Sequence, residues 1–171
     1  MARAETYVFD STPLIYLAKA ELLESLSRLP NPFLAPPRVE AEVLEAGRRQ
    51  GAAEVWRLER LVSEGRMRIR PLASRRMLER LREEPRLSDA DREAVALAAE
   101  SHGRLIADET PLRSVARVLD IPVGGSIFLL ARLVEMEFLS RSQARAALDR
   151  MVAAGWYCSP ALYRSTAALF E

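Results

Sequence analysis

The sequence contains very little cysteine and lysine, and each scarcity excludes a class of site. The single cysteine, Cys158, cannot form an intramolecular disulfide or supply a cysteine-based zinc site. Lys19 is the only lysine, which excludes a receiver-type phosphoryl-transfer site that needs a lysine on a late strand. No glycine-rich fingerprint supports dinucleotide binding. A haloacid-type phosphatase would need Asp-x-Asp after the first strand, where this chain has Asp10-Ser11-Thr12.

Long hydrophobic runs and a strong net charge are also absent. No apolar run approaches the length of a membrane span, and there is no signal peptide, so we expect a cytoplasmic protein without a membrane partner. The 25 basic and 24 acidic residues leave a formal net charge of +1, so any site for a polyanion must be a local patch. With 171 residues, 49% of them hydrophobic, the chain can bury the core of one domain. No linker divides it, and we expect a single domain over residues 1–171.

Short apolar runs alternate with amphipathic segments along the chain. This pattern is typical of a parallel sheet covered by helices. The predicted strands are residues 6–9, 32–35, 67–71, 104–107 and 121–123. The predicted helices include residues 38–46, 52–63, 74–84 and 89–101, and the chain after Gly125 is expected to be helical apart from a turn near Gly155. The expected fold class is therefore α/β, with a central, mostly parallel sheet of four to five strands.

Two five-residue segments nearly a hundred residues apart are almost identical. Residues 10–14 read Asp-Ser-Thr-Pro-Leu and residues 108–112 read Asp-Glu-Thr-Pro-Leu, and each follows a short apolar run. Threonine followed by proline is typical of a helix start, because the threonine oxygen can accept from a free amide and proline has a helical φ. Asp10 and Asp108 are therefore expected at the carboxyl ends of buried strands, the edge where open α/β sheets bind ligands. If the two carboxylates meet there, they need a cation.

A third carboxylate, Asp91, lies near the start of the predicted helix 89–101. Ser88 and Asp91 fit a capping box, in which each side chain bonds the other residue's amide. Helical spacing also places Asp91 on the apolar stripe of this helix and Asp89 on its charged face. An ionised carboxylate that faces the core is costly unless a metal, a cation or hydrogen bonds receive it. We therefore favour a site role for Asp91, which a capping role does not exclude.

Three glutamates occur in the predicted helix 38–46, which begins at the carboxyl end of the second strand. They are Glu40, Glu42 and Glu45. Helical phase alone does not select one of them, and a solvated helix face explains any single one.

One acidic position thus follows the first strand, and a second occurs in the helix after the second strand. A third lies at the start of the helix before the late strand, and a fourth follows that late strand. This order resembles the PIN-domain family, and most closely a prokaryotic subfamily that starts with Asp-Thr-Ser-Pro-Leu-Ile. Residues 10–15 have this start with the two hydroxyl residues exchanged. The subfamily's Val-x-x-Glu-Val segment is similar to residues 39–43 and selects Glu42.

The resemblance covers nearly the whole chain. Ala90-Asp91 matches the subfamily's Gly-Glu pair, and Asp108-Glu109 matches its Asp-Asp pair. Arg113 matches the arginine that follows that pair, and Gly125-Ser126 matches the Gly-Thr pair. The tail over residues 155–163 is also similar. Asp91 stands where the subfamily has glutamate and Glu109 where it has the second aspartate. Each of the four acidic positions nevertheless keeps a carboxylate.

The resemblance implies a three-layer α/β/α fold and a metal-dependent endoribonuclease, of the kind that serves as the toxin of a toxin–antitoxin pair. Mg²⁺ or Mn²⁺ suits a crevice lined by carboxylates. We expect Asp10, Asp91 and Asp108 to bind the metal and Glu42 to hold a ligand water or act as base. The alternative is a non-catalytic PIN module that binds nucleic acid or protein.

Substrate and partner contacts follow from the same resemblance. Ser11 and Thr12 could orient Asp10 or contact a phosphate, although helix capping explains both hydroxyls equally well. Arg113 is expected to bind RNA because it lies one helical turn after Asp108. The expected partners are RNA, a second copy of the chain and an antitoxin protein. The aromatic residues of the tail could form such an interface, although core packing explains most of them equally well; they are Trp156, Tyr157, Tyr163 and Phe170.

Overall fold

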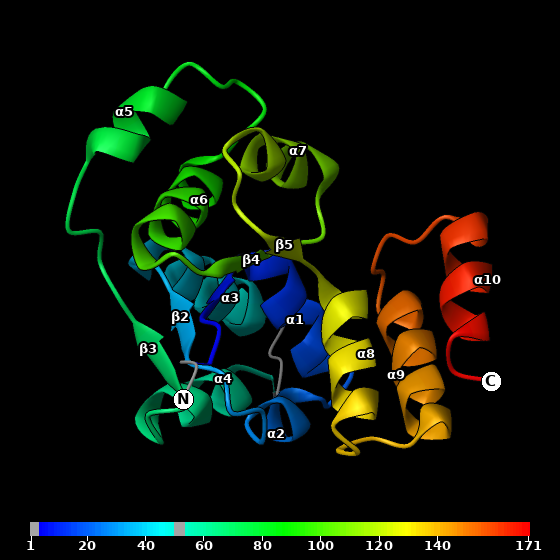
Figure 1. Cartoon of the computed structure of the whole chain (residues 1–171). Coiled ribbons are helices and arrows are strands. Elements are labelled where there is room, and N and C mark those ends of the chain that lie inside the picture. The colour runs from blue at the N-terminus through cyan, green and yellow to red at the C-terminus, as the bar shows by residue number, and fades with distance from the viewer. Residues whose placement is uncertain (1–3, 50–53) are drawn as a thin grey trace.

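The computed structural model describes residues 4–49 and 54–171, with a parallel sheet at its centre (Figure 1). The strands are β1 (Tyr7–Phe9), β2 (Phe33–Ala35), β3 (Met67–Ile69), β4 (Arg104–Ile106) and β5 (Val123–Gly124). They pair in the order β3-β2-β1-β4-β5, and every pairing is parallel. The expected sheet of four to five mostly parallel strands is confirmed.

Helices flank the sheet and give the expected α/β/α layers. Those among the described residues are α1 (Ser11–Lys19), α2 (Leu23–Leu26), α3 (Pro37–Arg49), α4 (Glu54–Ser63), α5 (Arg76–Leu81), α6 (Asp89–Ser101), α7 (Thr110–Val118), α8 (Ser126–Glu135), α9 (Arg141–Ala153) and α10 (Pro160–Ala168). The expected start of α4 at residue 52 lies outside the described residues. Of the described helices, none combines the length and apolar character that crossing a membrane requires.

The order in which strands are added to the sheet reverses beside β1. The chain first adds β2 and β3 on one side of β1 and then returns to add β4 and β5 on the other side. Because parallel crossovers are right-handed, the two halves place their helices on opposite faces of the sheet. The reversal falls between β1 and β4, and in open α/β sheets ligands bind outside the carboxyl ends of strands at such a point.

β1 is buried along its whole length, as expected for a central parallel strand covered on both faces. The Phe33 ring of β2 stacks on Tyr7 at 6.1 Å between centroids and meets Phe9 edge-on at 5.1 Å. The hydrophobic core extends from these strands into α1, α6, α8 and α9. The chain therefore emerges from the middle of the core at Asp10, the residue that follows β1.

The last strand begins later than the sequence pattern indicates. Residues 121–123 were expected to form it, whereas β5 is Val123–Gly124. Ile121 is buried as its hydrophobicity predicts, but its amide donates to the carbonyl of Ala116 and so closes the turn after α7. On this side of the sheet, the amide of Leu105 donates to the carbonyl of Pro122, and that of Ala107, which follows β4, donates to the carbonyl of Gly124.

Two helices begin with the same capping box. Ser88 Oγ accepts from the Asp91 amide in α6, and Ser140 Oγ accepts from the Gln143 amide in α9. In both boxes the second side chain accepts from the amide of the serine. The capping role expected for Asp91 is therefore confirmed.

We expect Ser88→Ala and Ser140→Ala each to lower the free energy of unfolding by about 1 kcal/mol, because each removes an acceptor from a free helix amide. Urea unfolding followed by circular dichroism measures both variants. A loss in the α9 variant without a loss in the α6 variant would contradict the role of Ser88.

Candidate active site

Asp10 directly follows β1, and its carboxylate has no hydrogen-bond donor among the described residues. Its amide donates to the carbonyl of Ile106 at 3.0 Å, which continues the pairing of β1 with β4. The residue is 1% exposed, and neither carboxylate oxygen has a hydrogen-bond partner among the described residues. A buried carboxylate without a partner is among the costliest groups that a fold can contain.

Burial, the largest cause, together with the negative charges of Asp91, Glu109 and Glu42, raises the pKa of Asp10 to about 8. The amide of Ser11 lowers the pKa of Asp10, with a larger effect than Glu109 or Glu42 has in the other direction. Neither carboxylate oxygen nevertheless has a hydrogen-bond partner among the described residues. These three acidic residues come from α6, the start of α7 and α3. Asp10 is thus the centre of a negative region to which segments distant in sequence contribute.

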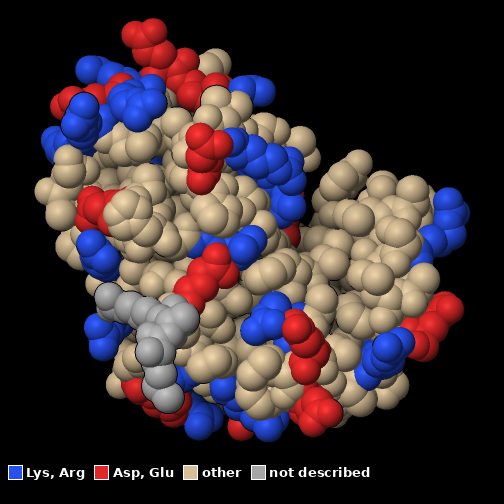
Figure 2. Space-filling model, in the orientation of Figure 1, with Lys and Arg blue, Asp and Glu red and all other residues tan. Residues whose placement is uncertain are grey.

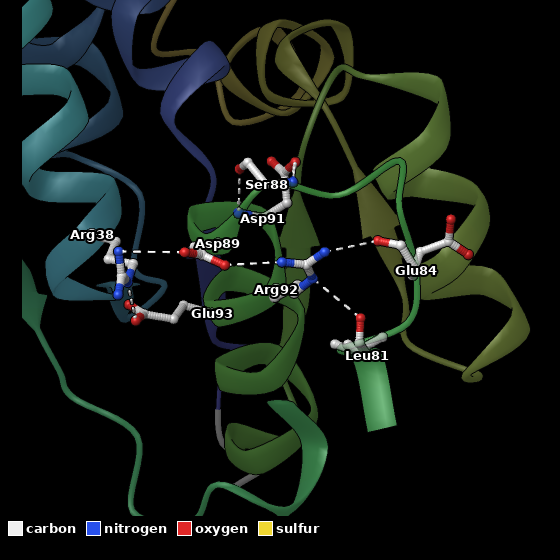
Figure 3. A network of polar contacts seen from close by, with 8 residues as sticks. All are labelled: Arg38, Leu81, Glu84, Ser88, Asp89, Asp91, Arg92 and Glu93. Atoms are coloured by element: carbon white, nitrogen blue, oxygen red, sulfur yellow. Dashed lines mark hydrogen bonds and ion pairs between the residues drawn. The ribbon is translucent and has the colours of Figure 1, made fainter. Parts of the chain in front are cut away.

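Asp91 caps its helix and also acts on Asp10 through its charge. Its Oδ2 accepts from the Ser88 amide at 2.7 Å, and among the neighbouring charges it is the largest contributor to the raised pKa of Asp10. Asp89 instead faces solvent, as expected, and lies between the guanidinium groups of Arg38 and Arg92 (Figure 3). The two aspartates at the start of α6 therefore point to different surroundings.

Arginines fix the start of α6 against its neighbours. Arg92 donates to the backbone carbonyls of Leu81 and Glu84 at 3.1 and 3.0 Å, which ties α5 and the segment after it to α6 (Figure 3). Arg38 at the start of α3 donates to Glu93 at 2.8 Å. The helix that carries Asp91 is therefore attached to the helix that carries Glu42.

Glu109 faces the same region, a question that sequence reasoning left open. Thr12 Oγ1 donates to Glu109 Oε1 at 3.2 Å, so the first turn of α1 is linked to the start of α7. The negative charge of Glu109 also raises the pKa of Asp10. The Thr12 hydroxyl thus bonds a neighbouring carboxylate and does not cap its own helix.

Asp108, the residue equivalent to Asp10 in the repeated segment, has quite different surroundings. Its Oδ1 accepts from the Ser126 amide at 2.7 Å, and its Oδ2 accepts from Ser126 Oγ at 2.6 Å and from Trp156 Nε1 at 3.0 Å. It is not among the main charges that raise the pKa of Asp10. Asp108 connects the end of β4 with the start of α8 and with the segment between α9 and α10.

Arg113 bonds the backbone beside Asp108, at the ends of β4 and β5. Its Nη1 donates to the carbonyls of Ala107 at 2.7 Å and Gly124 at 2.9 Å, which joins the ends of β4 and β5. Burial lowers the pKa of this guanidinium, the nearby Arg117 lowers it further, and Asp108 opposes both. The RNA contact expected for Arg113 stays a prediction beside this structural role.

Gly125 permits the close approach of these groups. A Cβ at this position would lie 2.7 Å from Asp108 Oδ1 and 2.9 Å from Arg113 Nη1, closer than real Cβ atoms come. Only glycine fits here, which supplies a physical reason for the Gly-Ser pair singled out in the sequence.

Among the glutamates of α3, Glu42 is the one whose charge acts on Asp10. Its side chain is exposed, whereas Glu40 is half-buried and is not among the main charges that act there. This favours the choice of Glu42. Within residues 4–49 and 54–171, however, no three His, Cys, Asp or Glu side chains are grouped so that they could hold a metal ion as they stand.

The sequence matches the family DUF3368, described as a PIN domain, over residues 6–171. The chain belongs to the PIN-domain family. PIN domains are generally nucleases that act on nucleic acid, typically with divalent metal ions. Many of them pair with antitoxins. No curated protein matches the sequence.

The acidic region of this PIN domain supplies oxygen atoms of the kind that a divalent cation binds, without a ready group of three such side chains in the described part of the chain. Both oxygens of Asp10 are buried without a donor from the described residues, and three further carboxylates act on it. Hard cations such as Mg²⁺ and Mn²⁺ take oxygen ligands of this kind and keep several waters. A positive charge at this place would remove the cost of burying Asp10 ionised.

We expect Asp10→Asn to stabilise the PIN domain in EDTA, and the gain to increase with pH. The folded-state pKa of about 8 lies above the unfolded value of about 3.9, so the native state loses stability as pH rises from about 4 to about 8. At about 1.4 kcal/mol for each pKa unit, the penalty reaches several kcal/mol. Urea unfolding between pH 5 and pH 9 measures it.

Asp89→Asn is the matched control, because this aspartate is exposed at the start of α6, the helix that carries Asp91. It should leave the pH dependence of unfolding unchanged. The same pH dependence in wild type and in Asp10→Asn would disprove an unpartnered Asp10.

We expect Asp108→Asn to destabilise the protein by about 1–3 kcal/mol, because an amide nitrogen in place of one oxygen cannot accept the bonds that Ser126 and Trp156 donate. In a Trp56→Phe background the fluorescence of Trp156 alone reports on this corner, and its emission should shift to the red. Asp120→Asn is the control, since Asp120 is exposed with φ 56°, a conformation that asparagine adopts readily. An unshifted spectrum and unchanged stability would contradict the role given to Asp108.

Proposed function

We propose that this protein is a metal-dependent endoribonuclease that hydrolyses RNA phosphodiester bonds with Mg²⁺ or Mn²⁺. The observation that carries the proposal is the buried, unpartnered carboxylate of Asp10 at the point where the strand order reverses, with Asp91, Glu109 and Glu42 acting on it. Membership of a family of nucleases supports the reaction class. A single domain over residues 1–171 is part of the proposal, supported by a core that includes both Tyr7 and Phe170.

We assign metal binding to Asp10, Asp91 and Glu109 and give Asp108 a positioning role. Both oxygens of Asp108 already accept hydrogen bonds, whereas those of Asp10 accept none from the described residues. Glu109 accepts a hydrogen bond from Thr12 through one oxygen, which leaves the other oxygen for a cation, and its charge acts on Asp10. This division differs from the expectation based on resemblance, in which Asp108 binds the metal.

Side chains around these carboxylates would take the proton from the attacking water and hold the phosphate. A bound divalent cation would lower the pKa of a water and neutralise charge on the phosphate. Glu42, exposed at the edge of the region, accepts the proton that the attacking water loses. Ser11 and the free amides at the start of α1 favour a phosphate oxygen, because backbone N–H groups at a helix start attract anions. Thr12 holds Glu109 in place.

The role of a toxin and the expected partners are proposed on the same basis. An antitoxin and a second copy of the chain need apolar surface, and Leu162 and Leu169 of the C-terminal region are largely exposed. Cytoplasmic localisation belongs to the same proposal.

One observation favours a second candidate function, a non-catalytic PIN module that binds nucleic acid or protein. The carboxylates around Asp10 do not form a ready group of three in the described residues. Calorimetric titration separates the two candidates, because absence of binding at millimolar Mn²⁺ favours the non-catalytic module.

The nuclease proposal predicts cleavage of RNA in Mn²⁺ or Mg²⁺ and none in EDTA. Asp10→Asn and Glu109→Gln should each lower kcat more than about 100-fold, since even the partners that orient metal ligands contribute about 10- to 100-fold. Glu40→Gln, on the same helix as Glu42, is the control and should retain activity within about twofold. Denaturing gels of labelled single-stranded and hairpin RNA measure the rates. Equal cleavage in EDTA would overturn the proposal, and full activity of Glu109→Gln would overturn the assignment of Glu109.

A further inference from the structure

The segment between α9 and α10 carries the most exposed aromatic ring in the described part of the chain. Tyr157 is 89% exposed, whereas the preceding Trp156 is 6% exposed and the following Cys158 is half-buried. Burial of a large aromatic side chain is favourable, so a ligand that covers the Tyr157 ring would gain free energy from the contact.

Contacts on both sides hold this segment in place. Tyr16 Oη of α1 donates to the carbonyl of Gly155 at 3.2 Å, and Trp156 Nε1 donates to Asp108 Oδ2 at 3.0 Å. After the ring, Ser159 Oγ accepts from the amide of Leu162 and caps α10. The exposure of Tyr157 therefore belongs to an ordered segment with a fixed backbone.

The same contacts tie the segment that carries Tyr157 to the end of β4, next to the residues that lead into α7. Trp156, its direct neighbour, bonds Asp108, and the residue after Asp108 is Glu109, whose charge acts on Asp10. The segment between α9 and α10 faces α7 across a hollow in the surface, and basic side chains lie on the α7 side of that hollow (Figure 2). The arginines of α7 are Arg113 and Arg117.

We propose that Tyr157 is a stacking platform for an unpaired base of single-stranded RNA that lies in this hollow. The inference rests on the proposed nuclease function and names the form of its substrate. Single-stranded nucleic acid presents negative phosphates and apolar base faces together, and proteins bind it with basic side chains beside exposed aromatic rings. The hollow has basic side chains on its α7 side and, on the other side, the segment that carries Tyr157. A base-paired duplex hides its base faces and cannot use the ring.

Binding of fluorescein-labelled oligonucleotides tests the platform in the Asp10→Asn background, so that the RNA stays intact. Tyr157→Ala should raise Kd for single-stranded RNA about tenfold and leave Kd for duplex RNA within twofold, because base stacking on an aromatic ring contributes on this scale. Tyr157→Phe keeps the ring and should bind as the parent does. Trp56→Ala removes a 50% exposed ring on α4, which lies apart from this segment (Figure 1), and should also have no effect.

Steady-state cleavage with Asp10 restored adds a second measurement. Tyr157→Ala should raise KM about tenfold and leave kcat unchanged. Unchanged Kd in Tyr157→Ala, or an equal loss for single-stranded and duplex RNA, overturns the platform. A change of sedimentation coefficient in Tyr157→Ala with unchanged RNA binding assigns the ring to a contact between copies of the chain and also overturns it. Binding that depends on Tyr157 without any cleavage by the protein refutes only the nuclease proposal.

Discussion

The carboxylate of Asp10 is the constraint around which the rest of the site is arranged. It follows a strand that is buried on both faces, so its burial is a direct consequence of the position of β1 in the middle of the sheet. A fold selected for stability alone would place an amide or an apolar group there, because a buried carboxylate without a partner is costly. Destabilising groups of this kind persist at functional sites, where a ligand supplies the missing interaction.

The two nearly identical segments show how tertiary context separates residues that look equivalent in sequence. Asp10 and Asp108 each end a parallel strand and precede a helix. The aspartate after β4 meets the first amide of α8 and the indole of Trp156, whereas the one after β1 meets no donor in the described chain. One carboxylate thus joins distant parts of the fold, whereas the other stays without a donor among the described residues. The difference depends on what the C-terminal third of the chain brings to the sheet edge.

The sequence predicts those parts of the molecule that local rules control. Apolar runs located the strands, the Ser88 and Asp91 pair located the start of α6, and the strand ends brought the acidic residues to one edge. Contacts between distant segments were beyond such rules, because they depend on packing. The bond between Trp156 and Asp108 spans 48 residues and leaves no periodic signal. The link between Thr12 and Glu109 spans 97, and a carboxylate beside a predicted ligand could equally have faced solvent.

The C-terminal helices are therefore part of the site's construction as well as of its core. α9 packs on α1, the helix that begins directly after Asp10, and Arg150 of α9 donates to the carbonyl of Ala20 just beyond that helix. Tyr16 and Asp108 then hold the segment that follows α9 from two sides. Because one aspartate bonds both α8 and this segment, the order of the tail and the shape of the acidic edge are coupled. Loss of the tail contacts would remove the indole donor from Asp108 and leave Ser126 of α8 as its donor, so the tail adds the third bond that fixes this carboxylate at the sheet edge.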